Sequence, residues 1–278
     1  MTSVVLDVIT TTGLLFVVAM GLLVVFGVLK IINFAHGAFL TIGGYAALVA
    51  TQLNLSPWLS WPLAFITGAV VGLLVERLVV RPLYDRPLDA ILATWGLGIV
   101  ISQFITLWFG REVQFTQSPL RGTVGVFGDT YSVYRLALLV VAVMLGLAFA
   151  ALIEGTRLGL SARAVIMNED LARGLGINTP RVRLITFTVG CGLAALAGAL
   201  ITPLSSVDPN MGVPWLINAF MLVMVAGSSF ASLALASFVL GGAQVVVSTY
   251  FSPILGGMTI VLLSAIVLRL RPSGFGRE

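Results

Sequence analysis

Long uninterrupted apolar stretches constrain the fold of this chain more than any other feature of its sequence. Residues 4–29 contain a single charged side chain, Asp7, and residues 133–153 contain only Arg135. About 20 apolar residues cross the hydrocarbon core of a bilayer. Because lipid offers no hydrogen bonds, such a segment must satisfy its own backbone as a helix. Continuous apolar runs such as residues 136–147 also lack the alternation of a barrel strand. The sequence therefore predicts an α-helical membrane protein.

The composition supports the same class. Hydrophobic residues make up 59% of the 278 residues and charged residues 9%, and the mean hydropathy is +1.09. A soluble chain carries roughly 25% charged residues, so this chain has too few charges to cover a globule in water. Its net charge of +4 comes from 15 basic residues spread along the sequence. A nucleic-acid-binding protein needs a dense basic face, and we exclude that class.

The apolar stretches predict an all-α polytopic transmembrane bundle of eight or nine spans, in a single transmembrane domain over residues 1–278. The pieces at 37–53, 214–229 and 231–249 are short, and we expect some of them to be half-helices or re-entrant segments. The predicted spans are residues 4–29, 37–53, 60–75, 91–109, 133–153, 182–202, 214–229, 231–249 and 254–270.

The basic residues indicate the orientation, because cytoplasmic loops are enriched in Lys and Arg. With nine spans and an outer N-terminus, twelve basic residues fall on the cytoplasmic side. Three fall outside, namely Arg111, Arg121 and Arg135. Eight spans give the same count if one short segment is re-entrant. We therefore expect a multi-pass protein with a cytoplasmic C-terminus.

The inventory of reactive side chains argues against an enzyme. His36 is the one histidine and Cys191 the one cysteine, so the sequence has neither an HExxH zinc motif nor an internal disulfide. No GxxxxGK[ST] motif surrounds the sole lysine, Lys30. We expect no catalytic residues, no metal and no cofactor. If ATP drives this protein, another subunit must hydrolyse it.

The polar side chains within the spans are mostly neutral. Proton- or sodium-coupled transporters usually place ionisable groups there. Neutral groups either pack helix against helix or line a path for a neutral or zwitterionic solute. The candidates for such a path are Asn33, Thr94, Gln103, Asn218 and Gln244.

A polar interruption separates the first two apolar stretches. Lys30, Asn33 and His36 lie within residues 30–39, and Gly37 permits an irregular backbone there. One interpretation is an ordinary turn at the membrane interface, with Lys30 reaching the headgroups. The other is a re-entrant connector at a cytoplasmic gate, in which Asn33 and His36 satisfy a broken helix end. The sequence leaves both open.

Residues 154–181 form the largest cytoplasmic segment, and its middle is amphipathic. Apolar residues that can share one helix face are Ala162, Val165, Ile166 and Leu171. Charged residues expected in solvent are Arg163, Glu169, Asp170 and Arg173. Gly174 and Gly176 should end the helix, and Pro180 should prevent an early restart. Such a helix either lies on anionic lipid or docks into a protein groove. The mixed acidic and basic surface favours the groove.

Five motifs together resemble the membrane subunits of branched-chain amino-acid ABC importers, in the order of that family and from about residue 13 to 275. They are Asn33-Phe-Ala-His-Gly, Glu76-Arg-Leu-Val-Val-Arg-Pro-Leu, Ala93-Thr-Trp-Gly-Leu, the run from Thr156-Arg-Leu-Gly to Gly176-Ile-Asn, and Arg271-Pro-Ser-Gly.

The resemblance implies an inner-membrane permease with several partners. Two ATPase subunits would dock on the cytoplasmic loops, a second homologous permease would pair with this chain, and a periplasmic binding protein would deliver the solute. Residues 161–176 would form the coupling helix that enters the ATPase groove. The residues implied in coupling are Gly159, Arg163, Glu169, Asp170, Arg173 and Gly176.

The resemblance leaves two substrate classes open. Residues 86–96 and 217–227 are closer to the urea and short-amide branch than to the leucine, isoleucine and valine branch. We therefore expect either branched-chain amino acids or urea and related amides. Two rival functions are also compatible with a membrane protein whose spans carry few charges. A passive small-solute channel would transport without ATP, and a non-transporting scaffold would show no flux.

Overall fold

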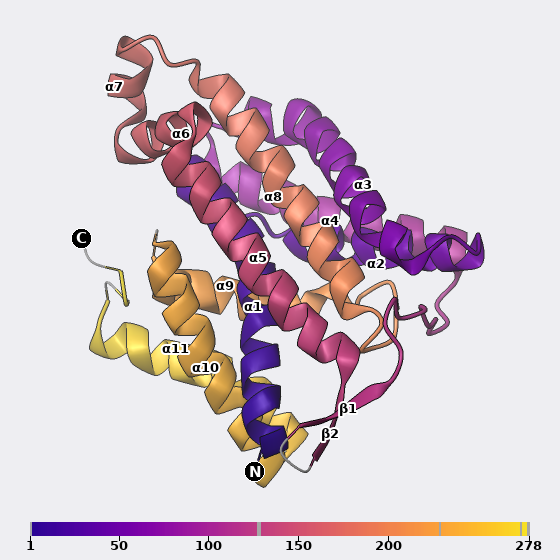
Figure 1. Cartoon of the computed structure of the whole chain (residues 1–278). Coiled ribbons are helices and arrows are strands. Elements are labelled where there is room, and N and C mark those ends of the chain that lie inside the picture. The colour runs from indigo at the N-terminus through magenta and orange to yellow at the C-terminus, as the bar shows by residue number, and fades with distance from the viewer. Residues whose placement is uncertain (1, 127–128, 228, 273, 277–278) are drawn as a thin grey trace. The chain divides into compact units, whose positions relative to one another are not determined.

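The computed structural model describes residues 2–126, 129–227, 229–272 and 274–276, and almost all of them are helical (Figure 1). Ser273, which belongs to the C-terminal motif, and Arg277, which follows the motif, lie outside the described residues. The chain divides into two compact units. The terminal unit comprises Met1–Met20, Ser118–Leu145 and Pro214–Glu278, and the central unit comprises Gly21–Gln117 and Gly146–Val213. A single domain over residues 1–278 stays a prediction.

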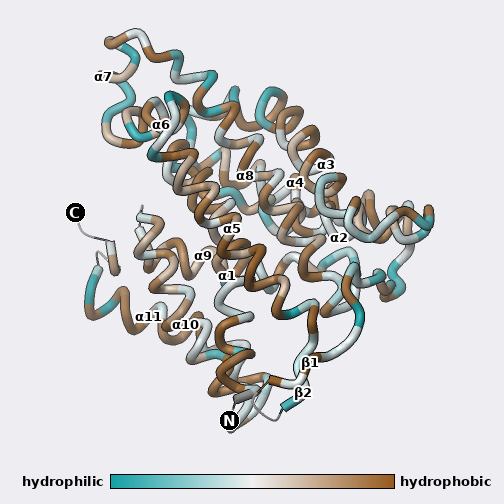
Figure 2. The backbone as a smooth tube through the Cα atoms, in the orientation of Figure 1, coloured by the Kyte–Doolittle hydropathy of each residue, from teal (hydrophilic) through white to brown (hydrophobic). Residues whose placement is uncertain are grey.

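Each of the nine predicted spans falls on a helix, which confirms a polytopic helical fold. These helices are α1 (Thr2–Leu29), α2 (His36–Gln52), α3 (Ser60–Val75), α4 (Pro87–Phe109), α5 (Val133–Gly155), α8 (Thr179–Ile201), α9 (Gly212–Ala226), α10 (Phe230–Tyr250) and α11 (Pro253–Leu270). Apolar residues run along them, and polar residues gather at the turns (Figure 2).

Seven helical stretches within the described ranges are long and apolar enough to cross a membrane. The helices α2 and α9 are shorter, with 17 and 15 residues. This agrees with the prediction of short pieces at 37–53 and 214–229. The same prediction for 231–249 is wrong, because α10 extends over 21 residues and reaches spanning length.

The second spanning stretch, Pro57–Leu83, is longer than the predicted span 60–75 and is not a regular α-helix. It continues from α3 into a π-helical segment, η2 (Glu76–Val80), and a 3-10 turn, η3 (Arg81–Leu83). Single π-helical turns within α-helices occur frequently at functional sites. This irregular end therefore marks a part of the central unit for closer attention.

Small residues hold the core of the central unit together. The helices α2 and α3 both lie beside α8 (Figure 1), and α8 is buried over most of residues 190–201. Gly43 of α2 faces the backbone of Ala195 so closely that a Cβ there would overlap it. Gly72 of α3 similarly faces the buried Cys191. In a membrane, such small residues let helices approach and gain van der Waals contact.

A hairpin occupies part of the predicted outer loop 110–132 in the terminal unit. Strands β1 (Thr123–Val126) and β2 (Asp129–Ser132) pair antiparallel. Asp7 of α1 accepts a hydrogen bond of 2.9 Å from the Tyr131 hydroxyl and forms an ion pair with Arg135. The Thr10 hydroxyl lies 3.1 Å from the same tyrosine oxygen. These contacts tie the hairpin to the start of α1, and burial raises the pKa of Tyr131.

Candidate functional site

The predicted interruption between the first two apolar stretches is a true break in the central unit. Helix α1 ends at Leu29, Lys30 adopts a left-handed backbone with φ of 54°, and α2 begins at His36. The Asn33 Oδ1 accepts a hydrogen bond of 3.1 Å from the Ala35 backbone N–H. Asn33 is 1% exposed and His36 is fully buried. Such burial does not fit an interfacial turn, and it favours the broken-helix interpretation.

Two of the proposed path residues meet at this break. Thr94 of α4 is 1% exposed, and its hydroxyl accepts a hydrogen bond of 3.3 Å from the Phe34 N–H. The same hydroxyl donates to the Ile91 carbonyl at 2.9 Å. Asn33 and Thr94 therefore flank one backbone segment. Gln103, also on α4, is exposed and does not join them.

The start of α2 lies deep among the helices of the central unit. A Cβ at Gly212 would overlap the backbone of Gly37, and the Gly212 N–H donates to the Thr41 hydroxyl at 3.3 Å. The Asn33 Nδ2 is buried without a hydrogen-bond partner among the described residues. Buried side-chain amides usually have a hydrogen-bond partner, so this group is an exception among the described residues.

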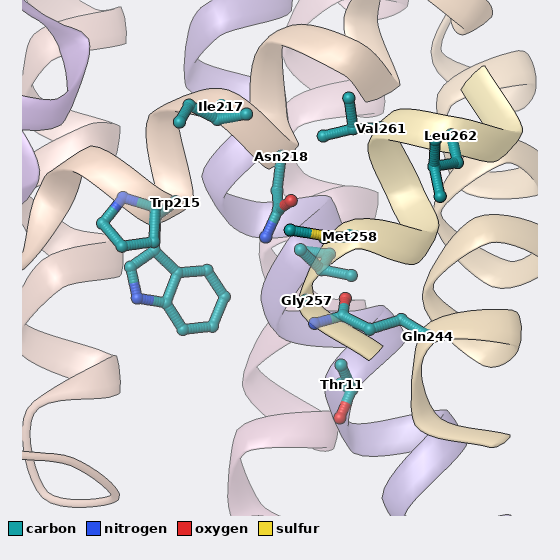
Figure 3. A pocket seen from close by; sticks show the side chains of 11 residues that line it. Thr11, Trp215, Ile217, Asn218, Gln244, Gly257, Met258, Val261 and Leu262 are labelled. Atoms are coloured by element: carbon teal, nitrogen blue, oxygen red, sulfur yellow. The ribbon is translucent and has the colours of Figure 1, made fainter. Parts of the chain in front are cut away.

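The other two path residues line a cavity of about 610 Å³ in the terminal unit. Asn218 comes from α9 and Gln244 from α10, and their carboxamides point into the same space (Figure 3). Trp215, Met258 and Leu262 contribute apolar wall. The Gln244 Oε1 is buried and lacks a partner in the part of the chain that the structure describes. The cavity therefore combines an apolar surface with two neutral amides.

The expected coupling helix at 161–176 is two helices rather than one. Helix α6 covers Arg157–Met167 and α7 covers Glu169–Gly174. Asn168 between them has extended backbone and accepts a hydrogen bond of 3.0 Å from the Leu171 N–H. The prediction of one helix is wrong because an asparagine that caps the next helix interrupts the first. The end of α7 at Gly174 agrees with the sequence, and Gly176 follows with φ of 86°.

The predicted faces of this segment are correct only in part. Val165 is buried as expected, but Leu171 is 61% exposed and Ala172 is buried in its place. The break at Asn168 changes the register, so a face extrapolated from α6 fails in α7. Arg163 and Asp170 are exposed as predicted.

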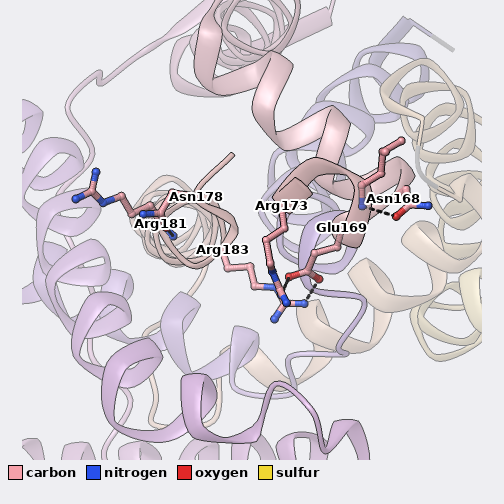
Figure 4. Close-up of polar contacts among 7 residues, drawn as sticks. Asn168, Glu169, Arg173, Asn178, Arg181 and Arg183 are labelled. Atoms are coloured by element: carbon pink, nitrogen blue, oxygen red, sulfur yellow. Dashed lines mark hydrogen bonds and ion pairs between the residues drawn. The ribbon is translucent and has the colours of Figure 1, made fainter. Parts of the chain in front are cut away.

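Glu169 was expected in solvent, but it is half-buried between two arginines (Figure 4). It pairs with Arg173 at 3.3 Å on its own helix and with Arg183 of α8. Gly159 also has a structural role, since a Cβ there would overlap the Ile153 backbone at the end of α5. Both residues thus fix helices α6 and α7, here called the coupling segment, against their neighbours.

Sequence reasoning missed a polar group that contacts Arg183, the ion-pair partner of Glu169. Glu76, the first residue of η2, is 1% exposed, and its carboxylate accepts a hydrogen bond from the Tyr84 hydroxyl. The Arg183 guanidinium lies 4.4 Å from the centre of the Tyr84 ring. Burial, followed by the bond to Glu76, raises the pKa of Tyr84. The available signal was a glutamate inside the predicted family motif, next to an apolar span.

The described residues suit binding and movement better than covalent chemistry. No group of three His, Cys, Asp or Glu side chains that could hold a metal occurs in the described ranges. The polar groups of the cavity and of the helix break are neutral amides and hydroxyls. They can bind a small polar solute, but they supply no activated nucleophile.

Comparison with known proteins places residues 4–270 in the family described as branched-chain amino acid transport system, permease component. LivH of Salmonella typhimurium, a high-affinity branched-chain amino acid transport system permease protein, is 28% identical, covering 92% of this chain and 89% of that protein. BraD of Pseudomonas aeruginosa has the same identity and the same coverage. LivM of Salmonella typhimurium is 25% identical over 92% of this chain and 67% of that protein.

Proposed function

The chain belongs to the family of branched-chain amino acid transport system permease components, and from this premise we propose how it works. It is a multi-pass membrane permease of the ABC transport type, and it is not itself catalytic. We propose that it pairs with a second, LivM-like permease. ATPase subunits would bind its coupling segment, and a periplasmic binding protein would supply the solute. The family match over residues 4–270 carries this proposal.

We propose branched-chain amino acids as the substrate class, because the LivH and BraD relatives carry that function in their names. The cavity beside Asn218 and Gln244 has a suitable character. Its volume lies in the range of small-molecule sites, about 300–1,000 Å³. The amides can hydrogen-bond the ammonium and carboxylate groups, and the apolar wall can receive a branched side chain. Urea would use the amides alone, which makes it the alternative that the tests below distinguish.

The break at Asn33, His36 and Gly37 is the proposed gate. A helix end that is already interrupted can reorganise without breaking a continuous hydrogen-bond ladder. Thr94 contacts this break through the Phe34 N–H, so movement of α4 would reach it directly. Gln103 remains a candidate for the path, with an exposed side chain that suits a contact outside this chain.

The six residues that the family resemblance implies in coupling have different roles in helices α6 and α7. Arg163, Asp170 and Arg173 are exposed and available to an ATPase groove. Gly159 and Gly176 shape the segment, and Glu169 attaches it to α8. In this arrangement the segment lies on the cytoplasmic side of a bacterial inner membrane, together with the C-terminus.

Uptake by two pocket variants tests the proposed path. Asn218→Leu and Gln244→Leu each replace an amide of the cavity by an apolar side chain of similar size. We expect leucine uptake to fall about tenfold, because a buried polar group of the ligand loses its partner. Gln52→Leu makes the same change at an exposed position on α2 and serves as the control. Normal uptake by both pocket variants would remove this cavity from the path.

Association with the ATPase tests the proposed partners. The tagged permease should retain an ATPase subunit and a second permease through purification from its own membrane. Hydrolysis by this complex should rise with the loaded binding protein. Leucine flux that continues without any associated ATPase would instead favour the passive channel.

A further inference from the structure

The coupling segment is connected to an irregular transmembrane helix through four polar side chains. We propose that Glu169, Arg183, Tyr84 and Glu76 form a positioning link, which transmits movement of α7 to the π-helical segment η2. The inference rests on the proposed ABC importer function. It names the contacts through which ATPase docking at α7 would change the conformation of η2.

The first contact attaches α7 to α8. Of the six residues of α7, Ala172 is buried, Glu169 is half-buried and the other four are exposed. Glu169 is thus the polar side chain that attaches this mostly exposed helix to α8. The Arg183 side chain that receives it is only 16% exposed. Such a pair is costly to break, since the remaining partner keeps an uncompensated, poorly solvated charge.

The second contact passes from Arg183 to the connection after η3. Its guanidinium lies 4.4 Å from the centre of the Tyr84 ring, within the range of a cation–π interaction. Arg183 therefore pairs with Glu169 through its terminal nitrogen and lies over the Tyr84 ring. An arginine suits both contacts because its guanidinium is planar and always charged.

The third contact passes from Tyr84 to the membrane span. Its hydroxyl donates to the Glu76 carboxylate, whose residue is 1% exposed. The second carboxylate oxygen, Oε2, is buried without a partner within the described ranges. A buried carboxylate is unstable unless hydrogen-bonded, so the state seen here satisfies Glu76 incompletely. A second arrangement of η2, in which both carboxylate oxygens had hydrogen-bond partners, would be stabilised. Movement of α7 through the link can then select between the two arrangements of η2.

The local backbone suits such a role. Glu76 begins the π-helical segment Glu76–Val80, and α3 before it packs tightly on α8 through small residues. A regular α-helix on one side and a π-helical turn on the other allow the end of the span to change register while α3 stays fixed. Docking at α7 would thereby change the end of the span without moving its core.

The test compares three variants of the complete importer in proteoliposomes. Glu169→Gln, Arg183→Gln and Tyr84→Phe should each lower the leucine transported per ATP hydrolysed about fivefold or more. Arg183→Gln and Tyr84→Phe, which lie outside α6 and α7, should leave ATPase association unchanged within about twofold. Arg181→Gln, two residues before Arg183 and exposed, is the matched control and should resemble the wild type. The Glu169→Gln/Arg183→Gln double variant should be no worse than either single one, because both belong to one route.

Hydrogen exchange of the permease alone separates this inference from the proposed function. In lipid nanodiscs without any ATPase, Tyr84→Phe should raise exchange in residues 169–174 as well as in residues 76–84. Exchange that changes only beside Tyr84 would overturn the link, whatever the transport result. Loss of ATPase association in all three variants, or an unchanged transport-to-hydrolysis ratio, would overturn it as well. A wild-type importer that ignores ATP would overturn the proposed function, while the exchange result would still test the link.

Discussion

The contact between α2 and α8 allows one substitution to be predicted in depth. A Cβ built on Gly43 lies 1.7 Å from the Ala195 carbonyl oxygen, and real Cβ atoms do not approach closer than 3.0 Å. Gly43→Ala must therefore separate the two backbones by about 1.3 Å at this point. Both atoms belong to helices rather than to flexible side chains, so neither can turn away.

This separation has a predictable cost. Overpacking a close-packed site typically costs about 1–3 kcal/mol, and the loss of van der Waals contact along the interface adds to it because contact holds membrane helices together. We expect the free energy of unfolding to fall by about 3 kcal/mol, and the Tm in detergent to fall by roughly 5 °C or more.

The matched control is Gly96→Ala in α4. No atom of the described residues lies within 4 Å of a Cβ at this position, and alanine favours a helix by about 1 kcal/mol over glycine. Thermal unfolding followed by circular dichroism, together with size exclusion of the heated sample, should therefore show Gly96→Ala at or above the wild type. An unchanged Tm for Gly43→Ala, or an equal loss for Gly96→Ala, would refute the close packing of α2 on α8.

Three further predictions follow from other contacts. Asp7→Asn removes the charge paired with Arg135, so limited proteolysis should cut the hairpin faster, although an exposed pair of this kind contributes only about 1 kcal/mol. Burial and the Glu76 bond hold the pKa of Tyr84 above its ordinary value of 10.0. The folded chain therefore keeps a proton that the unfolded chain loses, so stability should fall as the pH rises above that value, and this fall should be smaller for Tyr84→Phe. Gly159→Ala should weaken ATPase association, because the Cβ would overlap the end of α5, whereas Gly155→Ala, with open space around it, should have no effect. Pull-down of the ATPase measures the difference.

The sequence predicted the helices because their signal is local. The length and polarity of an apolar segment determine whether it crosses a bilayer. This property depends on the segment's own sequence and not on the helices that pack beside it. The break before His36 was also readable, since three polar residues interrupt apolar sequence there. The extent of α10 was underestimated by one residue at each end, because the predicted span 231–249 leaves out Phe230 and Tyr250.

The coupling segment shows where local reading fails. Asn168 can stand within a helix or cap the next one, and the choice depends on whether its side chain reaches the Leu171 N–H. The ion pair of Glu169 with Arg183 joins residues 14 positions apart, and Tyr84 returns to Glu76 through an irregular turn. No periodicity encodes such contacts. The cavity beside Gln244 likewise exists only after four helices have packed around it.

Uptake of labelled leucine and labelled urea, in cells with and without this chain and before and after ATP depletion, tests the central claim most directly. The family assignment predicts leucine uptake that requires both the chain and ATP, with urea uptake unaffected. Loss of urea uptake alone would assign the urea and amide branch instead. Leucine uptake that persists after ATP depletion, or that does not depend on the chain, would contradict its role as the permease of an ATP-driven importer.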